Sequence, residues 1–361
     1  MPVKLHVATW NVFTEILSGT TYVERLNATT ARQSLENRLR MLYSVVNEAF
    51  TILQQPHNLP DGTDYLRIFL APEYYFSRAE DRHLIADDEV RDIQSRLEAF
   101  SHSVPDVLLV PGTIAYYKPY DKPGLTKNEA RQRQEKYGHI LKGEAKRRKV
   151  KRKNLYLAHN TAYVYLDGRK IFSHRKHMDA HEVKENEAVP EENKRGRILF
   201  APGSGDGVFD LAMPNSQLTI GIEICADHHS KVLQDTGRTV DILLVPHASV
   251  TVRPDETSVR PGGYLVEARG GMKDILVNAS HVWKKGDNGV LSQVDLGSNQ
   301  SKGSGKPTFS GVREIRRKLK EDKQTMRDGL NEERPQQANQ FMVRYKATHG
   351  GILQLFELDY Q

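Results

Sequence analysis

Short hydrophobic runs alternate with amphipathic stretches along this chain. The runs are rich in Val, Ile, Leu, Tyr or Phe and end at Gly, Pro, Asn or Asp, a pattern that predicts β-strands. They cover residues 4–12, 65–73, 106–117, 160–167, 169–176, 217–225, 241–249, 274–280 and 351–359. Residues 29–53 and 87–104 instead place apolar side chains every three or four positions, which predicts two amphipathic helices. The Asp167-Gly168 pair predicts a hairpin turn. Strands that alternate with helices indicate a layered α/β fold.

Two polar segments interrupt this pattern, at about 118–154 and about 284–340. Neither holds enough apolar residues to bury a core of its own, so we expect one domain over residues 1–361 with two insertions. The first is strongly basic: between Lys118 and Lys153 it has 14 Lys/Arg and 4 Asp/Glu, whereas the whole chain carries a net charge of +6. Residues 141–153 could therefore contact a polyanion through charge, but they hold no aromatic side chain for base stacking.

The chain has a single cysteine, Cys225, which excludes an internal disulfide and fits a reducing compartment. Its N-terminus lacks a basic region followed by a long apolar one, so no signal peptide is expected. No apolar run approaches the ~20 residues needed to span a bilayer. We expect a soluble, cytoplasmic protein with no membrane partner.

Three of the predicted strands end on or near a chemically reactive side chain: Glu73, Lys176 and Cys225. Together these groups supply what amide cleavage needs. A thiolate is the nucleophile, and a nearby carboxylate can take the thiol proton and pass it to the departing amine. A fixed ammonium and a backbone N–H can stabilise the oxyanion of the tetrahedral intermediate.

The motifs around these residues resemble those of the nitrilase superfamily of carbon–nitrogen hydrolases. They occur in the order found in that family and extend, with gaps, over residues 4–280. The matching motifs are Ala71-Pro72-Glu73, Asn160-Thr161-Ala162, Asp167-Gly168, Arg175-Lys176-His177, Ile224-Cys225-Ala226-Asp227 and the Val-Pro of residues 241–249.

This resemblance implies a four-layer α-β-β-α sandwich and a Glu73–Lys176–Cys225 triad. It implies hydrolysis of a non-peptide C–N bond in a small-molecule amide, nitrile or carbamoyl compound through a cysteine thioester, with acyl transfer to an amine as a variant. By the same resemblance we expect no metal, no organic cofactor and a homo-oligomer.

Other residues are candidates for the oxyanion site or the pocket. The Ala226 N–H lies at the predicted strand-to-helix turn, and His228 would line the pocket or cap the helix. Members of the family often carry a second acid after the lysine; Glu182 is the nearest of several candidates. Glu223 departs from the usual small or apolar residue, although glutamine-hydrolysing domains of NAD synthetases have a similar Glu-Ile-Cys-x-Asp. Strand periodicity would place Glu223 on the same face as Cys225.

Three alternatives remain open. The spacing of His174, His177 and His181 could suggest a metal, but a strand end would scatter the first two. Residues 7–12, VATWNV, resemble the first strand of the endonuclease/exonuclease/phosphatase fold, in which Asn holds a metal, but the other motifs of that fold are missing. A catalytically silent scaffold is the third, although all three triad residues are present.

Overall fold

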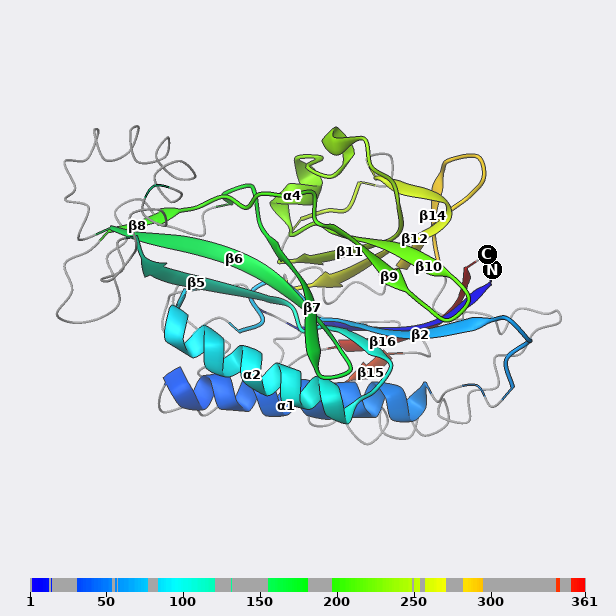
Figure 1. Cartoon of the computed structure of the whole chain (residues 1–361), viewed down its shortest axis with the longest axis horizontal. Coiled ribbons are helices and arrows are strands. Elements are labelled where there is room, and N and C mark those ends of the chain that lie inside the picture. Colours follow the sequence, from blue (N-terminus) through cyan, green and yellow to red (C-terminus); the bar gives the residue numbers. More distant parts are fainter. Residues whose placement is uncertain are drawn as a thin grey trace, which may run out of the picture.

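The chain has a mixed α/β fold with two β-sheets (Figure 1). The computed structural model describes residues 2–12, 14, 31–53, 56, 58–76, 84–120, 131, 155–180, 197–248, 250–253, 257–270, 282–294, 342–344 and 352–360. Within these residues the helices are α1 (Ala31–Ile52), α2 (Asp87–Ser103), the short α4 (Ala226–His229) and the 3₁₀ turn η3 (Gln234–Thr236).

The larger sheet, sheet A, has ten strands among the described residues. In spatial order they are β15 (Met342–Arg344), β16 (Ile352–Tyr360), β1 (Val3–Asn11), β2 (Asp64–Leu70), β4 (Val107–Val110), β6 (Leu155–Leu166), β5 (Thr113–Pro119) and β3 (Ile85–Ala86), with β7 (Arg169–Arg175) and β8 (Arg197–Phe200) also paired to β6. The order in sheet B is β14 (Leu291–Gln293), β13 (Val282–Lys285), β12 (Val259–Arg269), β11 (Val240–His247), β10 (Gln217–Ile222) and β9 (Val208–Ala212).

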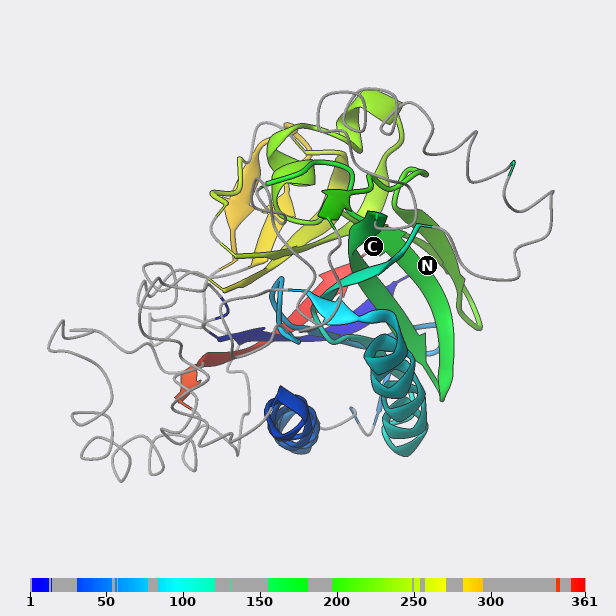
Figure 2. The same cartoon turned by 90° about the vertical axis from the view of Figure 1, so that its left-hand side faces the viewer.

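Helices α1 and α2 cover one face of sheet A (Figures 1 and 2). The predicted apolar stripe of α1, which includes Leu39, Leu42 and Val46, is buried against β1 and β16 in a cluster that also holds Trp10 and Leu355. The apolar stripe of α2 enters the same cluster. Both helices form at the predicted positions because burial of one face stabilises an amphipathic helix more than propensity does.

The other face of sheet A packs against sheet B. Leu5 and Ile68 of sheet A and Ile220, Leu244 and Val266 of sheet B are fully buried in this interface. In Figure 1 the layers follow in the order helices, sheet A, sheet B. Over the outer face of sheet B, the described residues place only the short α4 and η3. The α/β class is confirmed, and the expected fourth helical layer is not.

Most predicted strands form within a few residues of the expected bounds. The predicted hairpin at Asp167-Gly168 is confirmed, since both residues have the positive φ of a type I′ turn, 49° and 80°. The run 106–117 divides into β4 and β5 at Gly112, whose φ is 86°. A Cβ there would lie 2.3 Å from the Pro72 carbonyl oxygen, so only glycine allows this approach to the segment that carries Glu73. The predicted strand 274–280 lies outside the described residues.

The two expected insertions are described only in part. Of the basic one, residues 118–120 and 131 are described, so the 141–153 run and its polyanion contact stay predictions. At the start of the other, residues 284–285 end β13 and residues 291–293 form β14 at the edge of sheet B. The single-domain organisation also stays a prediction. Among the described helices, none is long and apolar enough to cross a membrane.

Truncation of a side chain between the sheets should destabilise the fold. Leu244→Ala is expected to lower the free energy of unfolding by about 2–5 kcal/mol, because it removes buried methyl groups and leaves a cavity. Urea denaturation followed by circular dichroism measures this. Val290→Ala, at a side chain that is 60% exposed, is the control and should change stability by less than about 0.5 kcal/mol. Equal effects of the two substitutions would contradict the assigned core.

Candidate active site

The structure brings Glu73, Lys176 and Cys225 together beyond the carboxyl ends of three strands. Glu73 follows β2, Lys176 follows β7, and Cys225 follows β10. Glu73 and Lys176 are completely buried, and Cys225 is 5% exposed. The three predicted side chains therefore lie together in the buried part of the protein, although the sequence separates them by up to 152 positions.

Glu73 is held on both of its carboxylate oxygens. Lys176 Nζ donates to Oε1 at 2.7 Å, and Asn160 Nδ2 donates to the same oxygen at 2.9 Å. The Ala248 backbone N–H donates to Oε2 at 3.2 Å. Because a buried charge is tolerated only when it is paired and hydrogen-bonded, these contacts define an ion pair with a fixed position.

Cys225 occupies a strained turn between β10 and α4. Its φ of 50° and ψ of −106° are unusual for a residue with a side chain, and its N–H donates to the Pro246 carbonyl oxygen at 3.1 Å. Helix α4 starts at the next residue, Ala226. The Ala226 N–H donates to no acceptor among the described residues, so it can serve the oxyanion role that the sequence predicts.

Burial raises the pKa of the Cys225 thiol well above its ordinary value. The negative charge of Glu73 and a hydrogen bond to its carboxylate raise that pKa further, whereas the Lys176 ammonium and the Ala248 N–H lower it. The thiol is therefore protonated in the resting protein, beside a carboxylate that can accept its proton.

Asp227 links the cysteine turn to the segment that carries the lysine. Its fully buried carboxylate accepts the His177 N–H at 3.0 Å and the Met178 N–H at 2.8 Å. Because Asp227 is two residues after Cys225 and His177 directly follows Lys176, these bonds fix the nucleophile relative to the cation. The sequence showed Asp227 within the Ile-Cys-x-Asp motif but gave no indication of this contact.

Glu223 and His228 contact each other and lie under α4. Glu223 Oε2 is 2.7 Å from His228 Nδ1, and its Oε1 accepts the Leu233 N–H at 2.9 Å. Ile222, Ile224 and Cys225 all join the core between the sheets, so Glu223 faces the opposite side. The expectation that Glu223 shares a face with Cys225 is wrong, because the positive φ of Cys225 ends the strand alternation.

Two further expectations concern the remaining candidates. Glu182 and His181 lie outside the described residues, so the choice of a second acid stays a prediction. His174 and His177 are not scattered by the strand end: their rings stack with centroids 5.4 Å apart, because the chain turns after β7 toward Asp227. Among the described residues, no group of three or more His, Cys, Asp or Glu side chains could hold a metal ion.

Three residues beside the triad were not singled out from the sequence. Asn160 and Ala248 contact Glu73, and Tyr74 places its ring 5.8 Å from Lys176 Nζ. The first two fall within motifs that indicated the family resemblance, at residues 160–162 and 241–249. Tyr74 has a φ of 59°, which sequence patterns do not reveal.

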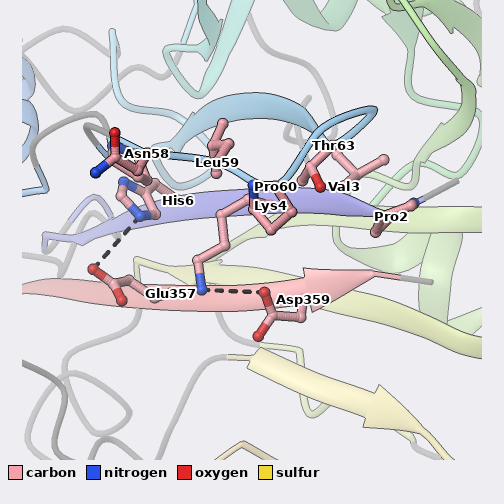
Figure 3. Close-up of a pocket in the computed structure, with 11 residues that line it drawn as sticks. Pro2, Val3, Lys4, His6, Asn58, Leu59, Pro60, Thr63, Glu357 and Asp359 are labelled. Atoms are coloured by element: carbon pink, nitrogen blue, oxygen red, sulfur yellow. Dashed lines mark hydrogen bonds and ion pairs between the residues drawn. The ribbon is translucent and has the colours of Figure 1, made fainter.

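A separate cavity of about 550 Å³ lies at the opposite ends of β1 and β2 (Figure 3). Pro2 and Thr63 line it near the starts of these strands, and His6 of β1 lies 3.5 Å from Glu357 on the neighbouring strand β16. None of the triad residues lines this cavity. It is therefore distinct from the candidate active site.

Comparison with solved structures gives similar folds among nitrilase-superfamily amidases. One is a cysteine variant of the Nesterenkonia AN1 amidase, 12% identical, with a TM-score of 0.35 over 74% of this chain and 76% of that one. An acrylamide complex of the same amidase is 13% identical, with a TM-score of 0.33 over 74% and 76%. A glutamine-dependent NAD+ synthetase from Acinetobacter baumannii is 15% identical, with a TM-score of 0.34 over 69% of this chain and 33% of that chain.

The chain thus matches about a third of the length of the synthetase. Protein-family models and curated proteins give no match. At these TM-scores the structural likeness is loose, and the function proposed below rests on the positions of the three side chains.

The buried thiol should titrate at a higher pH in the folded protein than in the unfolded chain. We expect the rate of Cys225 alkylation by iodoacetamide to rise with a midpoint above the ~8.5 of an ordinary thiol, because burial and Glu73 both favour the protonated form. Intact-protein mass spectrometry follows the single thiol over a pH series. The same chain in urea is the control, and equal midpoints in the two states would contradict the assigned environment.

Loss of the Asp227 carboxylate should loosen the connection between Lys176 and Cys225. Asp227→Asn is expected to lower the free energy of unfolding by about 1–3 kcal/mol, because the amide removes the negative charge and replaces Oδ2, which accepts the His177 N–H at 3.1 Å, with a donor. Thermal and urea denaturation measure this loss. Asp210→Asn is the matched control, since the carboxylate of the exposed Asp210 accepts a hydrogen bond from the Thr219 hydroxyl at 2.9 Å. Equal free energies of unfolding for the two variants would contradict the assigned connection through Asp227.

Proposed function

We propose that this chain is a nitrilase-superfamily carbon–nitrogen hydrolase that cleaves a small-molecule amide through a thioester on Cys225. The observation that supports this most strongly is the convergence of a buried carboxylate, ammonium and thiol, with Lys176 Nζ 2.7 Å from Glu73 Oε1. A buried ion pair is costly for stability alone, and titratable groups brought together beside a nucleophile are typical of active sites.

In the first half of the proposed reaction, the Cys225 sulfur attacks the amide carbon as the thiol proton moves to Glu73. The carbonyl oxygen becomes an oxyanion, which the Lys176 ammonium and the Ala226 N–H stabilise. Glu73 then gives its proton to the departing amine as the C–N bond breaks. The product is an acyl thioester, and Glu73 is again a carboxylate.

In the second half, Glu73 takes a proton from water, and the resulting hydroxide attacks the thioester carbon. The same donors stabilise the second oxyanion. The proton returns to the Cys225 sulfur as the C–S bond breaks, so the acid is released and the resting state is restored. An amine in place of water would give acyl transfer. Nitriles and carbamoyl compounds present an equivalent electrophilic carbon, so the proposal includes them as substrates. The proposal also includes a homo-oligomeric state of the protein.

The contacts of the Asn11 side chain do not support the alternative of a metal-dependent phosphodiesterase. In that alternative the Asn11 side chain would hold a metal. Instead it is fully buried, and its Nδ2 points to Thr9 Oγ1 at 3.3 Å. Its Oδ1 accepts the Arg269 N–H at 2.9 Å, so it connects sheet A to sheet B. These contacts give Asn11 a structural role.

Incubation with amides should acylate Cys225 and release ammonia. The panel contains acetamide, propionamide, glutamine and propionitrile, and the assays are ammonia release and intact-protein mass spectrometry. Wild type is expected to form an acyl adduct that EDTA does not affect. Cys225→Ala should form none, and Glu73→Gln and Lys176→Ala should lose turnover by several orders of magnitude.

Lys170→Gln is the control, because this exposed lysine on β7 contacts Gln94 and the Tyr163 ring and lies away from the triad. Turnover by Cys225→Ala at the wild-type rate would overturn the proposed function. Near-normal turnover by Glu73→Gln or Lys176→Ala would overturn the role given to that residue.

A further inference from the structure

Asn160 contacts both charged members of the triad. It is fully buried on β6, and its Nδ2 donates to Glu73 Oε1 at 2.9 Å. Its backbone carbonyl oxygen accepts the Lys176 N–H at 2.8 Å. One residue therefore fixes the carboxylate through its side chain and the lysine through its backbone.

The two carboxylate oxygens of Glu73 accept hydrogen bonds from different donors. Oε1 accepts from both Asn160 and Lys176, so its lone pairs are engaged. Oε2 accepts the Ala248 N–H at 3.2 Å, and this same N–H also acts on the Cys225 thiol. Oε2 is thus the oxygen on the thiol side and has a lone pair left for the thiol proton.

We propose that Asn160 is a positioning residue that fixes the plane of the Glu73 carboxylate so that Oε2 can exchange a proton with Cys225. This inference rests on the function proposed above. Lys176 alone cannot fix that plane, because an ammonium is a point charge on a flexible stem. The Asn160 amide on Oε1 at 2.9 Å and the Ala248 N–H on Oε2 at 3.2 Å together restrict the rotation that remains.

The other side-chain atom of Asn160 argues against a purely structural role. Its Oδ1 is buried and has no hydrogen-bond partner among the residues that the structure describes. Buried carbonyl groups without a partner are uncommon and cost stability. A side chain that served only to stabilise β6 would be better apolar, whereas a donor to Glu73 requires the amide.

Substitution of Asn160 should change both the rate and the pH dependence of turnover. With the amide of the panel that wild type turns over fastest, Asn160→Leu is expected to lower kcat by about 10–100-fold with little change in KM. The acid limb of the kcat/KM profile should move to higher pH, because the carboxylate has lost a donor to its charged form. Asn160→Asp should move it further, since it adds a like charge.

Asn215→Leu is the matched control. The Asn215 amide also donates to a carboxylate, at 3.1 Å to Asp64 Oδ1, but on an exposed turn between β9 and β10. It should leave kcat and the pH profile unchanged. A normal kcat and an unmoved acid limb in Asn160→Leu, in a protein whose Cys225→Ala variant is inactive, would overturn this inference alone. Activity in Cys225→Ala would overturn the proposed function instead.

A second measurement needs neither turnover nor a folded Asn160 variant. In protein labelled with ¹⁵N-asparagine, the Asn160 side-chain amide should exchange slowly with solvent, and Glu73→Gln should shift its resonance by more than that of Asn215. A fast-exchanging Asn160 amide that does not respond to Glu73→Gln would overturn the assigned contact.

Discussion

The ion pair between Glu73 and Lys176 is the interaction on which the site depends. Both side chains are completely removed from solvent and meet at 2.7 Å. Without its partner, either charge would carry a large desolvation cost, so each requires the other in place. Burial, and after it the negative charge of Glu73, raises the pKa of the Cys225 thiol, which stays protonated beside the carboxylate until a substrate accepts the sulfur.

The two facing sheets make this pair possible. Glu73 and Lys176 follow strands of sheet A, and Cys225 follows a strand of sheet B, so the packing of the two sheets brings the three side chains together beside an apolar interface. The Asp227 carboxylate then joins the two sides by its bonds to the backbone after Lys176. The Asn11 side chain makes a second polar connection between the sheets, to Arg269.

Buried acidic side chains on the outer face of sheet B are also paired with basic side chains. Glu223 meets His228 at 2.7 Å, and Glu267 meets His247 at 3.1 Å and the Arg269 guanidinium at 2.6 Å. His247 directly precedes Ala248, the residue whose N–H holds Glu73. This network therefore supports the backbone on which the site is built, although its side chains face away from the sheet interface.

The sequence by itself determined most of the strands, both long helices, the hairpin at Asp167-Gly168 and the three reactive residues. Periodicity and turn chemistry are local, so they can be read along a chain. Only the tertiary structure decided that Asn160 and Ala248 hold Glu73, that Asp227 connects the lysine and cysteine segments, and that Glu223 faces away from Cys225. These contacts depend on strand pairing between distant segments and on one strained φ at position 225. The pattern of hydrophobic and polar residues along the sequence reveals neither of these features.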